Sequence, residues 1–515
     1  MAVSQDASYS VEPLAWESFC RALSTVSVTT PQEVARKTST KYLFRVLTDQ
    51  LHAKTMLVEL DYTDRVYLDD FAAYYVRCFR SYARRCKRLH FFGSVLDFLE
   101  FERFITTPDS DSEIKQLAQN YKGFIVVRPI PHTVIGRTVL AAPSSYGTHV
   151  TQFPATRTYT ANLFGRNLKI ENSLVFQEQD TVISACATTA LWMSLDKASQ
   201  LFESGTLLPA AITDAANTVL NRERSIPSRG LLLEQLCNAI KRIGLEPEVV
   251  RVTRQTPVIS LLCAYVRFGI PVILGVEVQR KGRSPVQHAV TVVGFCDAGK
   301  RLRKIEAQSS NRLDLPTMMG QRIKYLVVHD DQIGPFNPLD IKTGDGESPV
   351  FLQSNWNYDG SRNPVKLRPT VVIVPVYNKV RVKFLEFQKW VSAFTRFVKT
   401  TGFRPSTEWD LHLVSNNEYK TYLKRILTEQ PDALKRLLTR QHPRYIWRAL
   451  LTANSKSRLE LLGDATEIGN SFPLYDAVWH DLGFKKSFRK KLDEVQQVSP
   501  DLHPRLLSYL SHIAS

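Results

Sequence analysis

The amino-acid sequence predicts a fold of the α+β class, in which separate stretches of the chain form the helices and an antiparallel sheet. In the middle of the chain, segments with helical spacing of apolar residues come first, and short valine-rich segments follow them. Because β-branched residues are enriched in strands, this order favours α+β over a regular alternation of strand and helix. The chain has 515 residues, 43% of them hydrophobic, which is ample for about three domains of roughly 150 residues each.

Changes in pattern along the chain predict four regions. The first is expected to be mainly helical, because residues 51–59 and 67–82 mix apolar and charged positions at steps of three and four. The regions are a mainly helical N-terminal part (1–115), a β-rich connecting segment (116–170), an α+β core (171–345) and a basic, mixed α/β C-terminal part (346–515). Prolines and glycines between 335 and 346 mark the last boundary.

The core contains the clearest elements. Apolar spacing predicts helices at 186–194, 208–221, 230–242 and 259–268, and strands at 249–252, 271–278, 288–295 and 325–329. Gly244 and Gly269 follow two of these helices, where glycine commonly ends a helix. Outside the core we expect strands at 124–129, 137–140 and 369–377 and a basic helix at 382–398.

The net charge of +17 is unevenly distributed. Residues 351–515 hold 26 lysines and arginines against 15 acidic residues, a net of +11, and residues 77–88 form a second basic cluster. Such charge suits an acidic protein partner or nucleic acid, although solvated helix faces explain it equally well. Nucleic acid is the less favoured partner, because no helix-turn-helix, zinc-finger or RNA-recognition pattern is present.

The sequence gives no sign of a metal, a cofactor or a membrane segment. The seven cysteines show no C-x-x-C spacing, and neither phosphate-binding glycine motif occurs. The apolar stretch 257–278 contains Arg267 and Glu277 and is broken at Gly269, so a helix followed by a strand is expected there rather than a membrane span. The chain opens without the pattern of a secretory signal, and we expect a cytoplasmic location.

Cys186 is a candidate nucleophile because it is expected at the first turn of a helix. Unpaired backbone N–H groups and the helix dipole stabilise a thiolate there, and can lower its pKa below the free value of about 8.5. The small neighbours Ala185 and Ala187 would leave the sulfur accessible. The alternative is a buried structural thiol, since free cysteines are commonly buried.

Two further polar positions follow in the sequence. His288 begins an expected strand, where its ring could face a cleft and accept a thiol proton; a hydrogen-bonded histidine at a strand end is the alternative. Asp330 and Asp331 directly follow the strand 325–329. A carboxylate there could hold the histidine in the required tautomer, although aspartate before a Gly-Pro turn is also common turn chemistry.

Taken together, these segments resemble the papain-like cysteine peptidases, and most closely the double-glycine peptidases that process bacteriocins and their uncharacterised bacterial relatives. The matching pieces are, in order, SACATTALWM, SRGLLLEQLCNAIKRIGL, YVRFGIPVILGVEV, HAVTVVGF and YLVVHDDQIGPF. They cover about a third of the chain, and HAVTVVGF is more specific than the cysteine helix. The resemblance implies a papain-like core, in which a cysteine-bearing helix packs on an antiparallel sheet.

By position, the resemblance implies Cys186 as nucleophile and His288 as general base and later general acid. Asp330 would orient the imidazole, and Asp331, which follows where the family has proline, is a rival for that role. The implied reaction is hydrolysis of a peptide or isopeptide bond in a protein or peptide substrate through a thioester.

The oxyanion-hole glutamine of the family departs from its usual place. It commonly lies about six residues before the cysteine, where this chain has Asp180, whose charge would repel an oxyanion. Gln179, one residue further away, is the expected donor, and Gln177 is the alternative. Two other functions remain open: an acyltransferase with the same triad, and a degenerate peptidase-fold protein that binds nucleic acid or an acidic partner.

Overall fold

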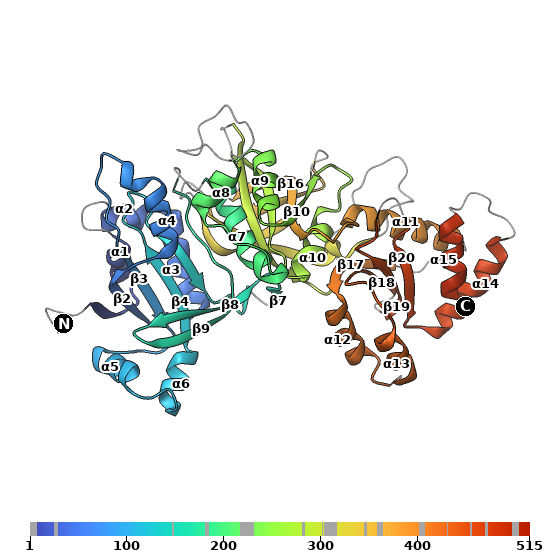
Figure 1. Ribbon diagram of the computed structural model, residues 1–515, viewed down its shortest axis with the longest axis horizontal. Coiled ribbons are helices and arrows are strands. Elements are labelled where there is room, and N and C mark those ends of the chain that lie inside the picture. The colour runs from blue at the N-terminus through green and yellow to red at the C-terminus, as the bar shows by residue number, and fades with distance from the viewer. Residues whose placement is uncertain are drawn as a thin grey trace.

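Figure 1 shows the computed structural model of the chain, in which N-terminal, central and C-terminal parts follow one another along the longest axis. The α+β prediction is confirmed, because helices cover sheets whose named strands pair in antiparallel fashion. The structure describes residues 8–24, 29–146, 149–180, 185–216, 231–280, 284–300, 302, 317–344, 348–357, 364–400, 407–429, 431–453, 456–468, 472–496 and 504–514.

The N-terminal part is built around a five-stranded antiparallel sheet. Its strands, in spatial order, are β1 (Tyr9–Pro13), β2 (Thr55–Tyr62), β3 (Cys86–Phe92), β4 (Tyr121–Val127) and β5 (Ile135–Leu140). The helical elements between them are α1 (Trp16–Leu23), α2 (Pro31–Arg36), α3 (Thr38–Arg45), η1 (Val46–Gln50), α4 (Arg65–Ala73), η2 (Tyr75–Arg77), α5 (Phe98–Thr106) and α6 (Ser112–Gln119). The sheet crosses the boundary expected at residue 115, because β4 and β5 lie beyond it.

The helix predicted over residues 51–59 is wrong, because β2 occupies most of that range as an inner strand of the sheet. The first four residues of β2 are all buried. A strand covered on both faces shows a continuous apolar run and lacks the alternation that identifies a half-exposed strand. The helix predicted over 67–82 is shorter than expected, since α4 ends at Ala73 and only the single turn η2 follows.

The connecting segment is β-rich, as expected, and contributes to two parts of the molecule. Its hairpin, β8 (Arg157–Leu163) with β9 (Arg166–Ser173), lies against β4 and β5. Its short strands β6 (Ser145–Tyr146) and β7 (His149–Gln152) extend the central sheet instead, because β7 pairs with β12 (Val286–Asp297).

The central part contains a closed ring of six antiparallel strands. They are β11 (Val272–Gln279), β12, β13 (Ile323–Asp330), β14 (Gly334–Thr343), β15 (Val350–Ser354) and β16 (Val365–Tyr377), and β11 pairs with both β12 and β16. A closed sheet has no free edges among its members. The ring extends past the boundary expected at residue 345, because β15 and β16 complete it.

The other central elements are α7 (Cys186–Phe202), α8 (Pro209–Ala216), α9 (Leu233–Arg242), β10 (Leu245–Arg251), α10 (Val258–Arg267) and η3 (Met319–Arg322). The predicted helices and strand overlap the first five, but α7 continues eight residues past 194, β10 begins four residues before 249, and η3 is not among the predicted elements. The end of the helix predicted over 208–221 lies outside the described residues. Gly244 and Gly269 follow α9 and α10 with φ of 83° and 94°, a left-handed conformation that glycine adopts readily.

Helix α7 packs directly on β12. The Thr291 hydroxyl of β12 donates to the Ala190 carbonyl of α7 at 3.0 Å, and the Ser194 hydroxyl donates to the Pro271 carbonyl at 2.5 Å. The small, buried residues Ala187 and Ala190 allow this close approach. The packing fixes the beginning of α7 relative to the strand that carries His288.

The C-terminal part is a four-stranded antiparallel sheet between two helical layers. Its elements are α11 (Phe384–Thr400), β17 (Thr407–Ser415), α12 (Asn416–Ile426), α13 (Pro431–Thr439), β18 (Tyr445–Ala453), β19 (Lys456–Asp464), β20 (Leu474–Trp479), α14 (Leu482–Gln496) and α15 (Pro504–Ala514). Trp447 of β18 stacks on Phe387 of α11 and meets Tyr265 of α10 edge-on, and an Arg267–Asp410 ion pair of 2.6 Å adds a second link to the central part.

No helix in the described part of the chain is long and apolar enough to cross a membrane.

Candidate functional site

Cys186 is the first residue of α7, as the sequence predicts. Its neighbour Ala185 caps the helix in an extended conformation, and the first turn of α7 carries no acidic side chain. Cys186 is partly exposed, whereas most of the helix behind it is buried. The thiol therefore lies at the positive end of the helix dipole.

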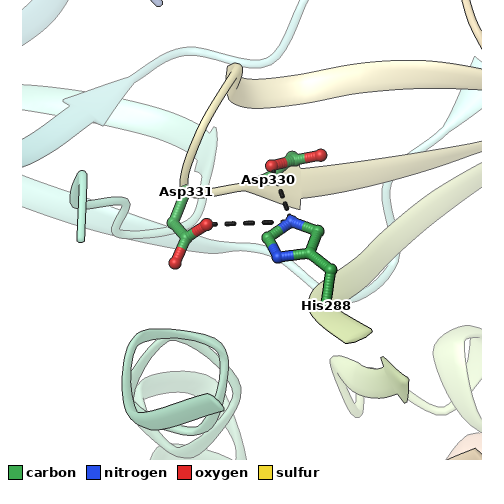
Figure 2. Close-up of side chains that lie close together, drawn as sticks. All are labelled: His288, Asp330 and Asp331. Carbon is green, nitrogen blue, oxygen red and sulfur yellow. Dashed lines mark hydrogen bonds and ion pairs between the residues drawn. The ribbon is translucent and has the colours of Figure 1, made fainter. Parts of the chain in front are cut away.

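His288 lies on β12 and is brought to Cys186 by the packing of α7 on that strand. Its side chain is 2% exposed, and its Nε2 atom lies 3.0 Å from Oδ1 of Asp330. In Figure 2 the dashed lines from both aspartates end at the Nε2 atom of the ring, and neither ends at Nδ1. A side-chain interaction with Cys186 also raises the pKa of this imidazole. The same ring therefore interacts with the thiol and with a carboxylate.

The electrostatics of this group favour a charged imidazolium. Burial lowers the pKa of His288, but the Asp330 carboxylate, through its charge and its hydrogen bond, and the contact with Cys186 raise it well above its usual value. A positive ring beside a thiol stabilises the thiolate form of the cysteine.

The two aspartates are not equivalent in the structure. Asp330 is fully buried at the end of β13, and the same Oδ1 that faces His288 accepts the backbone N–H of Gln332 at 3.0 Å. Asp331 lies further away, with Oδ1 3.8 Å from Nε2, and neither of its oxygens has a hydrogen-bond partner among the described residues. Burial and the charges of Asp330 and Glu178 raise the pKa of Asp331 to about 7, against the opposing charge of His288. The geometry thus favours Asp330 as the partner of the imidazole.

Among the described residues, His288, Asp330 and Asp331 form the group that could hold a metal ion. The potential ligand atoms of His288, Asp330 and Asp331 lie within 4.8 Å of one another. A cation bound there would occupy the Nε2 position that now faces Asp330. Such a cation would replace the direct hydrogen bond between Nε2 and Asp330.

The expected oxyanion-hole residues lie on the segment that precedes α7. Gln179 is partly exposed, whereas Gln177 is buried with 1% exposure. Asp180 is also buried, and its Oδ2 accepts the hydroxyl of Tyr75 at 3.1 Å, so this carboxylate is held by the N-terminal part. Residues 181–184, which connect the segment to Cys186, lie outside the described residues.

No local pattern in the sequence predicts that the N-terminal part contributes to this site. Glu178 forms an ion pair with Lys37 and accepts hydrogen bonds from the Ser39 hydroxyl and from the backbone N–H of Ile135, each at 3.3 Å. Arg128 donates to the backbone carbonyl of Glu178 at 2.9 Å. Residues 37 and 178 are 141 positions apart, and no local pattern relates them. The segment that leads to Cys186 is therefore anchored on α3 and β5.

The turn after Asp330 is anchored on the same helix. The Tyr42 hydroxyl of α3 donates to the Pro335 carbonyl at 2.8 Å, and the Thr38 hydroxyl donates to the Asn357 carbonyl at 3.1 Å. Gly334 lies against the Tyr42 ring, where a Cβ atom would come within 2.3 Å of it. Helix α3 thus supports both the loop before Cys186 and the turn after Asp330.

Replacing Asp330 by asparagine is expected to lower the pKa of His288. In the wild type, the raised pKa contributes stability that is complete below the unfolded value of about 6.5. That contribution is lost as the pH rises through the folded pKa. In the variant this contribution should be smaller and its loss should be complete at a lower pH, measured by urea unfolding from pH 5 to 9 and by NMR titration of ¹³C-labelled histidine. Asp331→Asn is the matched control, and an equal shift in both variants would contradict the assignment of Asp330.

The Lys37–Glu178 pair is expected to show strong coupling in a double-mutant cycle with Lys37→Met and Glu178→Gln. Their side chains are 23% and 8% exposed, so removing one partner leaves a largely buried charge. We expect a coupling energy of about 1–3 kcal/mol from urea unfolding. The exposed Lys491–Glu494 pair is the control, with about 0.5 kcal/mol or less. Equal coupling in the two pairs would show that the anchoring of Glu178 adds no stability.

Comparisons with known proteins do not place the chain in a family: no protein-family model matches it, and no curated protein matches it.

Proposed function

We propose that this chain is a cysteine peptidase with a papain-like core, which hydrolyses a peptide or isopeptide bond in a protein or peptide substrate. The observation that carries this proposal is a buried imidazole on β12 that pairs with Asp330 of the neighbouring strand and interacts with Cys186 at the start of the helix packed on β12. Cys186 and His288 are 102 residues apart, and His288 and Asp330 are 42 residues apart. A nucleophile, a base and an orienting group in this order form the arrangement that activates thiols in peptidases.

The architecture around the three residues supports the papain-like resemblance. The cysteine begins a helix that packs on an antiparallel sheet, the histidine lies on the strand beneath that helix, and the aspartate ends the neighbouring strand. The segments that resemble the family lie within residues 171–336. The closed ring of strands extends beyond this block, because β16 ends at Tyr377.

In the proposed reaction, the Cys186 thiolate attacks the substrate carbonyl carbon and forms a tetrahedral oxyanion. The C–N bond then breaks, His288 gives its proton to the leaving amine, and a thioester remains on Cys186. His288 next takes a proton from water, and the resulting hydroxide attacks the thioester, which releases the carboxylic acid and restores the Cys186 thiolate beside the protonated imidazole. Asp330 keeps the imidazole oriented throughout. Transfer of the same thioester to an amine would make the chain an acyltransferase.

The first test measures the alkylation of each cysteine by iodoacetamide between pH 5 and 9, read by peptide mass spectrometry. We expect Cys186 to react fastest and to do so already near pH 6, and we expect His288→Ala to remove this advantage. Cys263 and Cys296 are buried and serve as internal controls. A Cys186 that reacts no faster than these two, or a rate that His288→Ala leaves unchanged, would contradict the proposed pair.

The second test concerns Gln179. We expect Gln179→Ala to lower turnover of a tryptic peptide library by about 100- to 1000-fold, the usual loss for one oxyanion-hole donor. The alkylation rate of Cys186 should stay unchanged, because that step forms no oxyanion. Gln177→Ala is the control, with turnover close to wild type. A larger loss for Gln177→Ala would assign the oxyanion-hole role to Gln177 instead.

Hydroxylamine, added to the reaction as an acceptor for the thioester, is used to separate hydrolysis from acyl transfer.

A further inference from the structure

An exposed basic surface lies between η2 and β3. We call it the arginine surface, and it consists of Val76, Arg77, Phe79, Arg80, Arg84 and Arg85, all of which are exposed. Phe79 is fully exposed and Val76 is half exposed, so apolar and cationic groups alternate on it. From residue 71 to residue 96 the sequence contains no aspartate or glutamate.

The arginines of this surface are poorly neutralised by the protein itself. Among the described residues, Arg85 has one acidic partner, Asp61 at 3.4 Å, and both side chains are 62% exposed, so the pair is weak. Arg77, Arg80 and Arg84 have no carboxylate within ion-pair distance in that part of the chain. Arg80 lies over the ring of Tyr82 and Arg84 over the ring of Phe71, at 5.8 and 5.6 Å. The rings restrict these two guanidinium groups without cancelling their charge.

The arginine surface is held next to the candidate active site. Tyr75 directly precedes it, and the Tyr75 hydroxyl donates to Asp180, six residues before Cys186. The rings of Tyr75 and Tyr82 are 4.9 Å apart, so the two sides of the exposed segment are joined at its base. Because six residues span at most about 20 Å, the Tyr75 hydroxyl at the base of the arginine surface lies within about that distance, plus the length of one aspartate side chain, of Cys186.

We propose that the arginine surface binds an acidic segment of the peptidase substrate, one that carries aspartates or glutamates and an apolar side chain near the cleaved bond. This inference rests on the proposed function. Carboxylates are the groups that the unpaired arginines can bind, and Phe79 and Val76 supply contact area for an apolar side chain. An acidic peptide is favoured over nucleic acid because the neighbouring thiol and imidazole act on peptide carbonyls.

The test uses full-length Cys186→Ala protein, so that binding is measured without cleavage. The probe is a fluorescein-labelled ten-residue peptide of glutamates with one central leucine, followed by fluorescence anisotropy at low salt. We expect the triple variant Arg77→Glu, Arg80→Glu, Arg84→Glu to weaken binding by about tenfold or more, and added salt to weaken the wild type as the charges are screened. The matched control reverses Lys424, Arg425 and Lys435, which are exposed on α12 and α13, and should change binding by less than about twofold.

Each outcome decides the proposal. Equal weakening by the two triple variants would overturn it, because general attraction to a basic protein would then explain the binding. Stronger competition from a single-stranded oligonucleotide of the same charge would assign the surface to nucleic acid instead. Arg77→Gln, Arg80→Gln, Arg84→Gln replaces the first variant if circular dichroism shows that it is misfolded.

A separate measurement distinguishes failure of this inference from failure of the proposed function. Wild type and the triple variant are incubated with a tryptic peptide library, and the cleaved bonds are mapped by mass spectrometry. Enrichment of acidic residues around the bonds cut by wild type, lost in the triple variant, is the expected result. Cleavage without such enrichment would overturn the acidic segment and leave the peptidase intact, whereas no cleavage dependent on Cys186 would overturn the peptidase itself.

Discussion

The buried imidazole of His288 is the constraint on which the site depends. A ring withdrawn from water becomes charged only if an anion lies against it, and Asp330 supplies that anion at 3.0 Å. The pairing of β12 with β13 brings these two residues together, and the packing of α7 on β12 adds Cys186. Asp331 is equally buried, but among the described residues its oxygens have no hydrogen-bond partner, and burial raises its pKa to about 7. Hydrogen bonding by Asp330 to His288 and Gln332 therefore distinguishes the two adjacent carboxyl groups.

The N-terminal part contributes to the site although it holds none of the three reacting groups. Lys37, Arg128 and Tyr75 hold the segment that leads to Cys186, and Tyr42 holds the turn that follows Asp330. Helix α3, with Lys37 at its N-cap and Tyr42 on its side, thus contacts both loops of the site. Such support determines how accurately a donor such as a glutamine amide is aimed, and misplacement by about 1 Å can cost a reaction about a hundredfold.

Local patterns in the sequence were sufficient for much of the central part. The helix start at Cys186, the strand of His288 and the glycine after α9 all follow from apolar spacing and turn residues, and the structure has them in those places. Local patterns failed where burial on both faces removed the alternation, as in β2. They also could not reveal the ion pair of Lys37 with Glu178, or which of the two aspartates lies closer to the imidazole. These features depend on tertiary contacts between segments far apart in the chain.

The closed ring of strands limits how the chain could be shortened. A fragment cut at the boundaries expected from sequence, 171 and 345, would lack β15 and β16. It would expose the edges of β11 and β14, and unpaired strand edges promote aggregation. It would also lose Lys37 and leave the Glu178 carboxylate without its cation. A fragment that keeps these contacts and the complete N-terminal sheet runs from before β1 to the end of β16 at Tyr377, so the N-terminal sheet and the central ring of strands have to be kept together in any truncation or domain exchange.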